Sequence, residues 1–171
     1  GADVPFLRPA KLATDLANTR DVLIHALNFL VEQGDYYDYL VLLQPTSPFR
    51  QIGTIDEAIQ LAINNANVDM VVSVKETSQN PYYVLFEEDQ HGYLKSSNQG
   101  DYKRRQACPK VYEYNGSIYV IRINSIRKHA TMKFPKTIKY MMSDLESIDL
   151  DTEMDWKFAE FLTSQDIFIS E

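Results

Sequence analysis

The stretch from Tyr39 to Arg50, YLVLLQPTSPFR, holds the two features that decide the fold. Its first five residues form a continuous apolar run of strand length, which is typical of a strand covered on both faces by helices. Pro45 and Pro48 lack an amide donor, so the chain must leave the sheet at Gln44. Because ligands of open α/β sheets bind beyond the carboxyl ends of the strands, this polar loop is a candidate floor for a binding site.

Helix-like and strand-like segments alternate on both sides of this stretch. Residues 18–34 carry apolar side chains at helical spacing and end in a glycine, which predicts a helix. Thr54 and Glu57 have capping-box spacing and predict a helix that continues to about Asn65. Residues 70–74, MVVSV, predict a second strand. This order favours right-handed crossovers and a parallel sheet, so the predicted class is α/β.

The segment from about Asn80 to Lys110 interrupts this alternation. Period-2 residues over 82–87 and a turn at 90–92 predict an antiparallel ribbon outside the main sheet. A tight turn at Asn115 and Gly116 is expected before a returning strand at 117–122. A last helix is expected after Asp151 and Thr152. One face of that helix carries Met154, Phe158, Phe161 and Leu162.

Length, charge and cysteine content restrict the class of protein. The 171 residues suit one domain, residues 1–171, with a substantial core. A formal charge of −7 argues against nucleic acid or an anionic membrane as the main partner, because both require a dominant basic face. Cys108 is the only cysteine, and no apolar run is long enough to span a bilayer. We therefore expect a cytoplasmic protein with no nucleic-acid or membrane partner.

The polar loop itself supplies the first set of candidate site residues. Gln44 offers an amide, Thr46 and Ser47 offer hydroxyls, and Arg50 offers a positive charge for an anion. The alternative is an ordinary proline-stiffened connection in which the hydroxyls make local backbone bonds. Composition alone does not choose between a binding loop and a structural one.

A basic cluster provides the second set of candidate residues. Lys103, Arg104 and Arg105 precede Gln106, and Lys110 follows closely, in an otherwise acidic chain. Guanidinium groups bind carboxylate and phosphate with a planar, two-pronged geometry, so such a cluster suits a sugar acid or a phosphate chain. The alternative is a solvated run of charges.

Two carboxylates near the C-terminus form the third set. In an extended segment alternate side chains share a face, so Asp149 and Asp151 are expected to point the same way. Mg²⁺ is commonly held by one or two carboxylates together with substrate phosphates, which makes this pair a candidate magnesium site. The alternative is that Asp151 only caps the last helix and Asp149 is solvated.

The three sets of candidate residues, in their order along the chain, resemble motifs of the acylneuraminate cytidylyltransferase family, the CMP-sialic acid synthetases and their relatives. The resemblance extends over nearly the whole chain, and the combination of LLQPTSP with SIDLDTE is specific. The matching segments are VPFLRP at 4–9, LLQPTSPFR at 42–50, DMVVSV at 69–74, RRQACPKVYEYNGSIYV at 104–120 and SIDLDTEMD at 147–155.

Membership in this family implies a three-layer, Rossmann-like nucleotidyltransferase core that makes a CMP-sugar acid and pyrophosphate from CTP and a nine-carbon sugar acid. By this resemblance Gln44 contacts the sugar acid, the region from Arg104 to Asn115 helps to form the sugar pocket, and Asp149 and Asp151 hold Mg²⁺. It also implies that the segment at about 80–110 is a dimerisation arm of a homodimer.

The sequence departs from the family pattern in two places. The family begins with a strand and a Gly-rich loop around the CTP phosphates, so we expect a chain that lacks this loop and is inactive by itself. Glu113 stands where sialate-using members often have a basic residue. Two other interpretations stay open: a nucleotidyltransferase for another sugar or sugar phosphate, and a non-catalytic module for sugar-acid binding or dimerisation.

Overall fold

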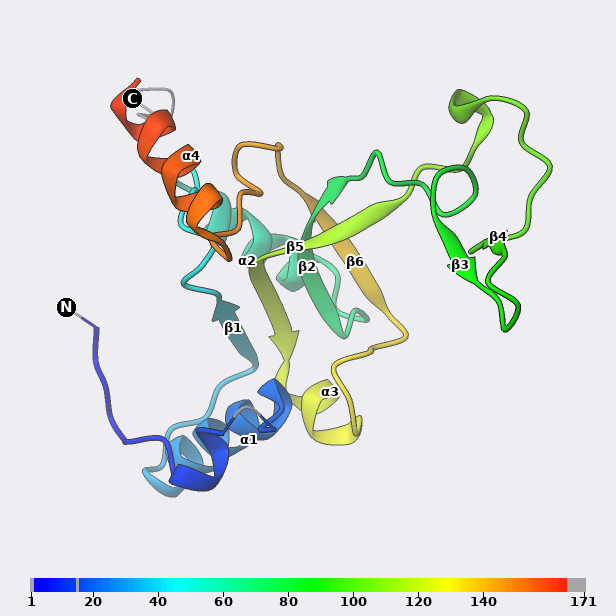
Figure 1. Ribbon diagram of the computed structural model, residues 1–171. Helices are drawn as coiled ribbons and strands as arrows, with labels where there is room; N and C mark the ends of the chain where they lie inside the picture. Colours follow the sequence, from blue (N-terminus) through cyan, green and yellow to red (C-terminus); the bar gives the residue numbers. More distant parts are fainter. Residues whose placement is uncertain (1, 15, 166–171) are drawn as a thin grey trace. The chain divides into compact units, whose positions relative to one another are not determined.

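A computed structural model describes residues 2–14 and 16–165 (Figure 1). The chain divides into two compact units. Unit 1 contains residues up to 42 together with 55–72 and 119–138. Unit 2 contains 43–54, 73–118 and the described residues from 139 onward. Each unit is described by itself below. Within the described residues, no helix is both long enough and apolar enough to cross a bilayer.

Unit 1 is built around the predicted first helix. A short 3-10 helix, η1 (Ala10–Leu12), precedes α1 (Thr19–Glu32), whose first turn is capped by the Asn18 side chain. Leu23 and Leu27 of α1 are buried, which confirms the predicted apolar face. Helix α2 (Thr54–Asn64) buries Ala58 and Ala62, and α3 (Ile123–Lys128) follows the long strand β5 (Tyr112–Arg122).

The main sheet has four strands in the order β1-β5-β2-β6. They are β1 (Tyr39–Leu43), β2 (Met70–Glu76), β5 (Tyr112–Arg122) and β6 (Thr137–Met141). Strand β5 runs opposite to the other three (Figure 1). The predicted α/β class with a mostly parallel sheet is therefore confirmed, with one antiparallel strand inserted between β1 and β2.

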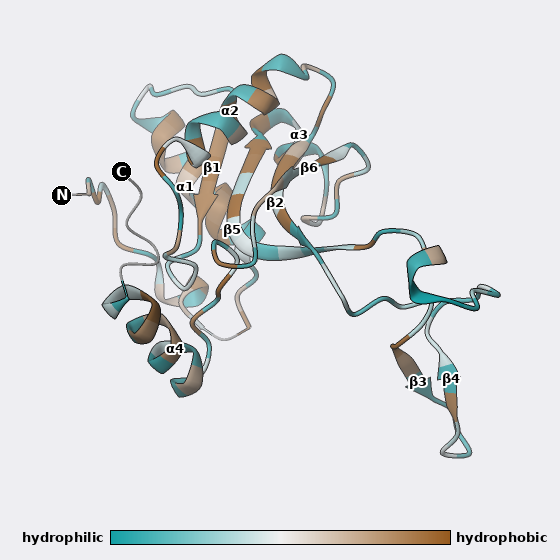
Figure 2. Cartoon of the chain, turned by 90° about the horizontal axis from the view of Figure 1, so that it is seen from above, coloured by the Kyte–Doolittle hydropathy of each residue, from teal (hydrophilic) through white to brown (hydrophobic). Residues whose placement is uncertain are grey.

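Strand β1 differs from its prediction in burial. We expected helices on both faces, but Val41 and Leu43 are 36% and 39% exposed. In the described part of the chain β1 is an edge strand, because only β5 pairs with it. The buried apolar run belongs instead to the central strand β2, where residues 70–74 are all buried. Figure 2 shows this apolar character along the sheet strands.

The predicted tight turn at Asn115 and Gly116 is wrong. Both residues lie inside the continuous strand β5, and Gly116 adopts φ 76° there. The Ser117 amide donates to Asn115 Oδ1, and the Ile118 amide donates to Ser73 Oγ. Because side chains replace the usual backbone acceptors at these amides, this point has the character of a bulge rather than of a chain reversal.

The segment between β2 and β5 contains the expected antiparallel ribbon. Strand β3 (Phe86–Glu88) pairs with β4 (Leu94–Ser96), and Gly92 has φ 82° in the turn between them. The ribbon strand was predicted from residue 82 but begins only at Phe86. A 3-10 helix, η2 (Arg105–Ala107), lies on the return path to β5.

Helix α4 (Glu153–Ser164) exposes most of the face that its spacing singled out. Ala159 and Leu162 are buried, whereas Met154, Phe158 and Phe161 are 72%, 47% and 55% exposed. Apolar spacing therefore identified the helix correctly but not the side that packs, and Figure 2 shows brown segments along α4.

Candidate functional site

The polar loop after β1 is held in shape by Arg50. Its Nη2 donates to the carbonyl oxygens of Gln44, at 2.7 Å, and Ser117, at 3.1 Å. Its Nε donates to Ser117 Oγ at 2.8 Å. Burial lowers the pKa of this guanidinium from its ordinary value. Arg50 thus braces the loop against β5, a structural role that the sequence did not indicate.

Ser47 places the loop beside the first of the two predicted carboxylates. Ser47 is fully buried, and its Oγ lies 3.5 Å from Asp149 Oδ1 and 3.3 Å from the Asn115 carbonyl oxygen. The Leu150 amide donates to the Thr46 carbonyl oxygen at 2.8 Å, which aligns the two segments. The predicted convergence of the proline-braced loop with the acidic segment is therefore present for Asp149.

Asn115 is the centre of a buried hydrogen-bond network under this cluster. Its Oδ1 accepts from Ser73 Oγ at 2.6 Å, and its Nδ2 donates to Ser147 Oγ at 2.9 Å. Asn115, Ser73 and Ser147 are at most 6% exposed. The Asn115 amide therefore ties β5 to β2 and to the segment that carries Asp149, so its position is structural.

Asp151 is not the cap of the last helix, which corrects the alternative considered for it. Thr152 is the N-cap: its Oγ1 accepts from the Asp155 amide, while Asp155 Oδ2 accepts from the Thr152 amide at 2.7 Å. The Thr152 hydroxyl and amide lower the pKa of Asp155. Asp151 itself is exposed, so its carboxylate is open to a ligand.

The donor chemistry at this cluster fits a magnesium ion. Within the described residues no group of three or more His, Cys, Asp or Glu forms a closed metal cage. Mg²⁺ needs only one or two carboxylates when phosphates and water complete its shell. No salt bridge between described residues involves Asp149 or Asp151. A Cβ at Gly116 would lie 3.8 Å from Asp149 Oδ2, so the glycine keeps this side of the carboxylate open.

Thr46 borders an apolar cavity of about 770 Å³. Pro45, Pro48 and Phe49 of the loop and Trp156 of α4 also line it. This cavity lies on the loop but offers few polar groups, so it does not add to the carboxylate cluster.

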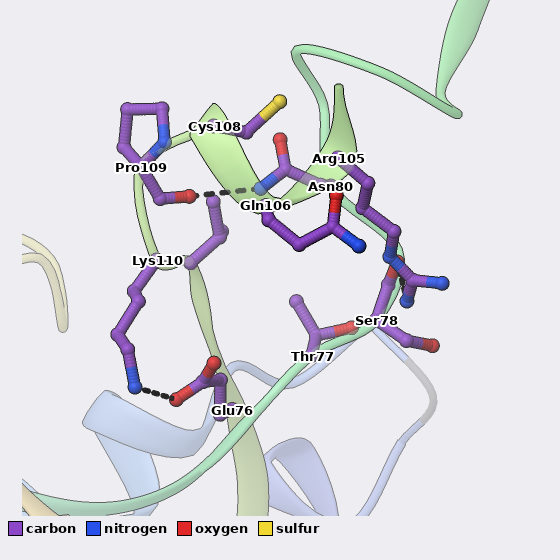
Figure 3. A pocket seen from close by; sticks show the side chains of 10 residues that line it. Glu76, Thr77, Ser78, Asn80, Arg105, Gln106, Cys108, Pro109 and Lys110 are labelled. Atoms are coloured by element: carbon purple, nitrogen blue, oxygen red, sulfur yellow. Dashed lines mark hydrogen bonds and ion pairs between the residues drawn. The ribbon is translucent and has the colours of Figure 1, made fainter.

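The predicted basic residues lie in a different place from the carboxylate cluster. Arg104, Arg105 and Gln106 are exposed. Arg105 and Gln106 line a cavity of about 560 Å³ together with Thr77 and Lys110 (Figure 3). Arg105 Nη2 donates to the Ser78 carbonyl oxygen at 2.9 Å. Among the described residues no hydrogen bond or ion pair joins these side chains to Ser47, Asn115 or Asp149, so they form two sets rather than one.

The β2 side chains that lie beside Glu113 were missed as part of the site. Lys75 Nζ lies 2.9 Å from Glu113 Oε1. Lys75 is the first cause, and Thr77 a weaker one, of a lowered pKa at Glu113. The period-2 alternation of Ser73, Lys75 and Thr77 could have indicated this row, because alternate strand residues share a face.

Comparison with known proteins finds relatives that match nearly the whole chain. No protein-family model matches the sequence. The chain is 32% identical over 163 residues to a CMP-N,N'-diacetyllegionaminic acid synthase of Legionella pneumophila, which covers 95% of this chain and 69% of the relative. It is 30% identical over 169 residues to the post-translational flagellin modification protein B of Campylobacter coli, covering 96% of this chain and 70% of the relative.

The fold also has a counterpart among solved structures. A CMP:2-keto-3-deoxy-manno-octonic acid synthetase, solved in complex with CTP, superposes with a TM-score of 0.57. The match covers 89% of this chain and 70% of that chain at 14% sequence identity. At this identity the likeness concerns the fold alone, and it agrees with the α/β class derived above.

Proposed function

Since this chain belongs to the acylneuraminate cytidylyltransferase family, we propose that it serves the transfer of CMP from CTP to a nine-carbon sugar acid with release of pyrophosphate. The observation that supports this most directly is the approach of the QPTSP loop to the acidic segment, with Ser47 Oγ 3.5 Å from Asp149 Oδ1. Two segments about a hundred residues apart thus form one polar cluster.

In this reaction the anomeric hydroxyl oxygen of the sugar acid forms a bond to the α-phosphorus of CTP. The bond from that phosphorus to the bridging oxygen breaks, pyrophosphate leaves with the electron pair, and the hydroxyl proton passes to a base. We assign Asp149 and Asp151 as the carboxylates beside the reacting groups, and Gln44 and Thr46 as hydrogen-bonding groups of the loop. Asn115 and Arg50 hold the floor of the site in place.

Mg²⁺ is the cofactor that we propose, held by Asp149 and Asp151. When bound, it neutralises charge on the phosphates. Ser47 fixes the orientation of the Asp149 carboxylate through its hydroxyl, and Gly116 leaves space beside Oδ2. Asp151 is exposed on the same segment and is free to turn toward an incoming ligand.

We propose that the cavity lined by Arg105 and Gln106 receives the carboxylate of the sugar acid. Arg104 and Arg105 are exposed guanidinium groups, which bind carboxylates in a two-pronged manner, and Gln106 adds an amide. One donor of Arg105 is used by the Ser78 carbonyl oxygen, which leaves others for a ligand.

We also propose that the arm at about 80–110 joins two copies of the chain. Phe86, Tyr93 and Leu94 of the ribbon are 52%, 70% and 69% exposed, and apolar side chains on so small a ribbon favour a protein partner. A homodimer should therefore become monomeric when Phe86 and Leu94 are both replaced by serine, as measured by light scattering after gel filtration. A wild-type monomer at high concentration would argue against this arm.

The function is tested by titration calorimetry on the chain itself and by pyrophosphate release from a fusion in which the first strand and Gly-rich loop of a family relative are joined to its N-terminus, because the chain is expected to be inactive by itself. We expect N-acetylneuraminate or N,N'-diacetyllegionaminic acid to bind, and pyrophosphate release to require CTP and Mg²⁺, with ATP and EDTA as controls. Failure of every nine-carbon acid to bind, together with no pyrophosphate from CTP, would contradict the proposal. A cytoplasmic location, where CTP is available, is part of the same proposal.

A further inference from the structure

We propose that Glu113, paired with Lys75, determines which sugar acid is accepted, by taking a hydrogen bond from a neutral donor group of that acid. This inference rests on the proposed function and deepens it. The donor is a hydroxyl or an acylamide N–H, the two neutral donor groups that sugar acids carry.

Glu113 lies on a face that strands β2 and β5 share. Ser73 bonds to Asn115, and the next side chain on that face of β2, Lys75, bonds to Glu113. Glu113 is two residues from Asn115 along β5, a rise of about 7 Å. Thr77, which lies two residues beyond Lys75, lines the cavity that contains Arg105. Glu113 therefore stands between the carboxylate cluster and the cavity that contains Arg105.

Exposure separates Glu113 from its buried neighbours. The side chain of Glu113 is 42% exposed and that of Lys75 is 31% exposed, whereas Ser73 and Asn115 are at most 6% exposed. An ionised carboxylate only accepts hydrogen bonds and has about four acceptor positions. Lys75 occupies one of them. The remaining acceptor capacity on the exposed side is available to a ligand.

The charge of the pair explains how an acidic residue is compatible with an acidic substrate. Lys75 balances the charge of Glu113, so the pair is neutral as a whole and does not repel an anion strongly. The Glu113 oxygens themselves still favour a donor over an anion. The substrate carboxylate is therefore directed toward Arg104 and Arg105, and an uncharged N–H or O–H toward Glu113.

The test compares sugar-acid binding in four variants by titration calorimetry. Glu113→Gln should weaken binding of the accepted acid about tenfold or more, because a hydrogen bond to a charged group is lost. Lys75→Glu combined with Glu113→Lys restores the ion pair but replaces the acceptor by a donor, so it should fold normally and lose the wild-type preference. Lys75→Gln should weaken binding less than the exchanged pair. Glu153→Gln, which breaks an exposed ion pair on α4, is the control.

The ligands are N-acetylneuraminate, N,N'-diacetyllegionaminic acid and 2-keto-3-deoxy-manno-octonic acid, which lacks acylamide groups. An effect of Glu113→Gln confined to the first two assigns the donor as an amide, and an effect on all three assigns a hydroxyl. An exchanged pair with wild-type affinities and preference would show that the ion pair is only structural and would overturn the inference while the proposed function stands. A wild-type chain that binds none of the acids would overturn both.

Discussion

The hydroxyl oxygen of Ser47 lies 3.5 Å from a carboxylate oxygen of Asp149, although 102 residues separate them in the chain. Ser47 is fully buried and also contacts the Asn115 carbonyl oxygen, so its rotamer is fixed from two sides. The loop that ends β1 thereby sets the orientation of a carboxylate that is contributed by a segment near the C-terminus.

In the fusion that carries the Gly-rich loop of a relative, Asp149→Asn and Asp151→Asn should each lower pyrophosphate release about 100-fold or more, because loss of one electrostatic group at a developing charge typically costs about 10²–10³ in rate. Both should also weaken Mg²⁺ binding in a calorimetric titration of the chain. Asp144→Asn, an exposed residue on the preceding turn, is the matched control. Wild-type rates in both variants would remove these residues from the site.

Gly116→Ala should affect the site and the fold, whereas Gly34→Ala should affect only the fold. Both glycines have positive φ, 76° and 91°, so each alanine should cost about 1–2 kcal/mol of unfolding free energy. Only at Gly116 would the new methyl lie near Ser47 Oγ, at 3.4 Å, and near Asp149 Oδ2. Urea denaturation and Mg²⁺ titration measure the two effects. Unaltered Mg²⁺ affinity in Gly116→Ala would argue against a metal beside Asp149.

Asn115→Ala should destabilise the chain strongly. The substitution removes the hydrogen bonds from Asn115 to Ser73 and Ser147, each worth about 0.5–1.5 kcal/mol, and takes the Oδ1 acceptor from the buried Ser117 amide, which costs about 1–3 kcal/mol more. Urea unfolding checks this, with the exposed Asn98→Ala as the control. Equal stability of the two variants would mean that the network contributes little.

Thr152→Ala should reduce stability by about 1 kcal/mol, because the N-cap of α4 loses its hydroxyl. Thr152→Ser keeps the hydroxyl and should lose much less. The difference between the two variants in thermal unfolding isolates the cap. If both unfold alike, the capping box does not support α4.

The ion pair of Glu113 gives a pH dependence of defined sign. Lys75 lowers the pKa of Glu113 in the folded chain, so the unfolded chain takes up this proton first as the pH falls. The stability that the pair contributes is present above the ordinary pKa of glutamate and is lost as the pH drops through the lower, folded value. The difference in unfolding free energy between wild type and Glu113→Gln should therefore shrink from about pH 7 to about pH 3. A difference that is constant over this range would exclude an ionised pair.

Local pattern was sufficient for some elements and insufficient for others. Strand β1, helix α1 and the turn of the arm follow from apolar periodicity and glycine placement, which depend on neighbours in sequence. The dipeptide Asn115-Gly116 has the same composition in a turn and in a bulge, so only the neighbouring strand β2 settled its role. The sequence likewise could not predict which face of α4 is exposed. Apolar spacing shows which residues share a side of the helix, but not which side the rest of the protein covers.

The sequence by itself determined the class of fold, the position of the proline-braced loop and the candidate carboxylates, because these depend on residue type and on short-range spacing. Only the tertiary structure decided that Arg50 braces the loop, that Ser47 meets Asp149, and that Lys75 pairs with Glu113. These contacts join residues far apart in the chain, and their formation depends on strand order and burial, which no local pattern encodes.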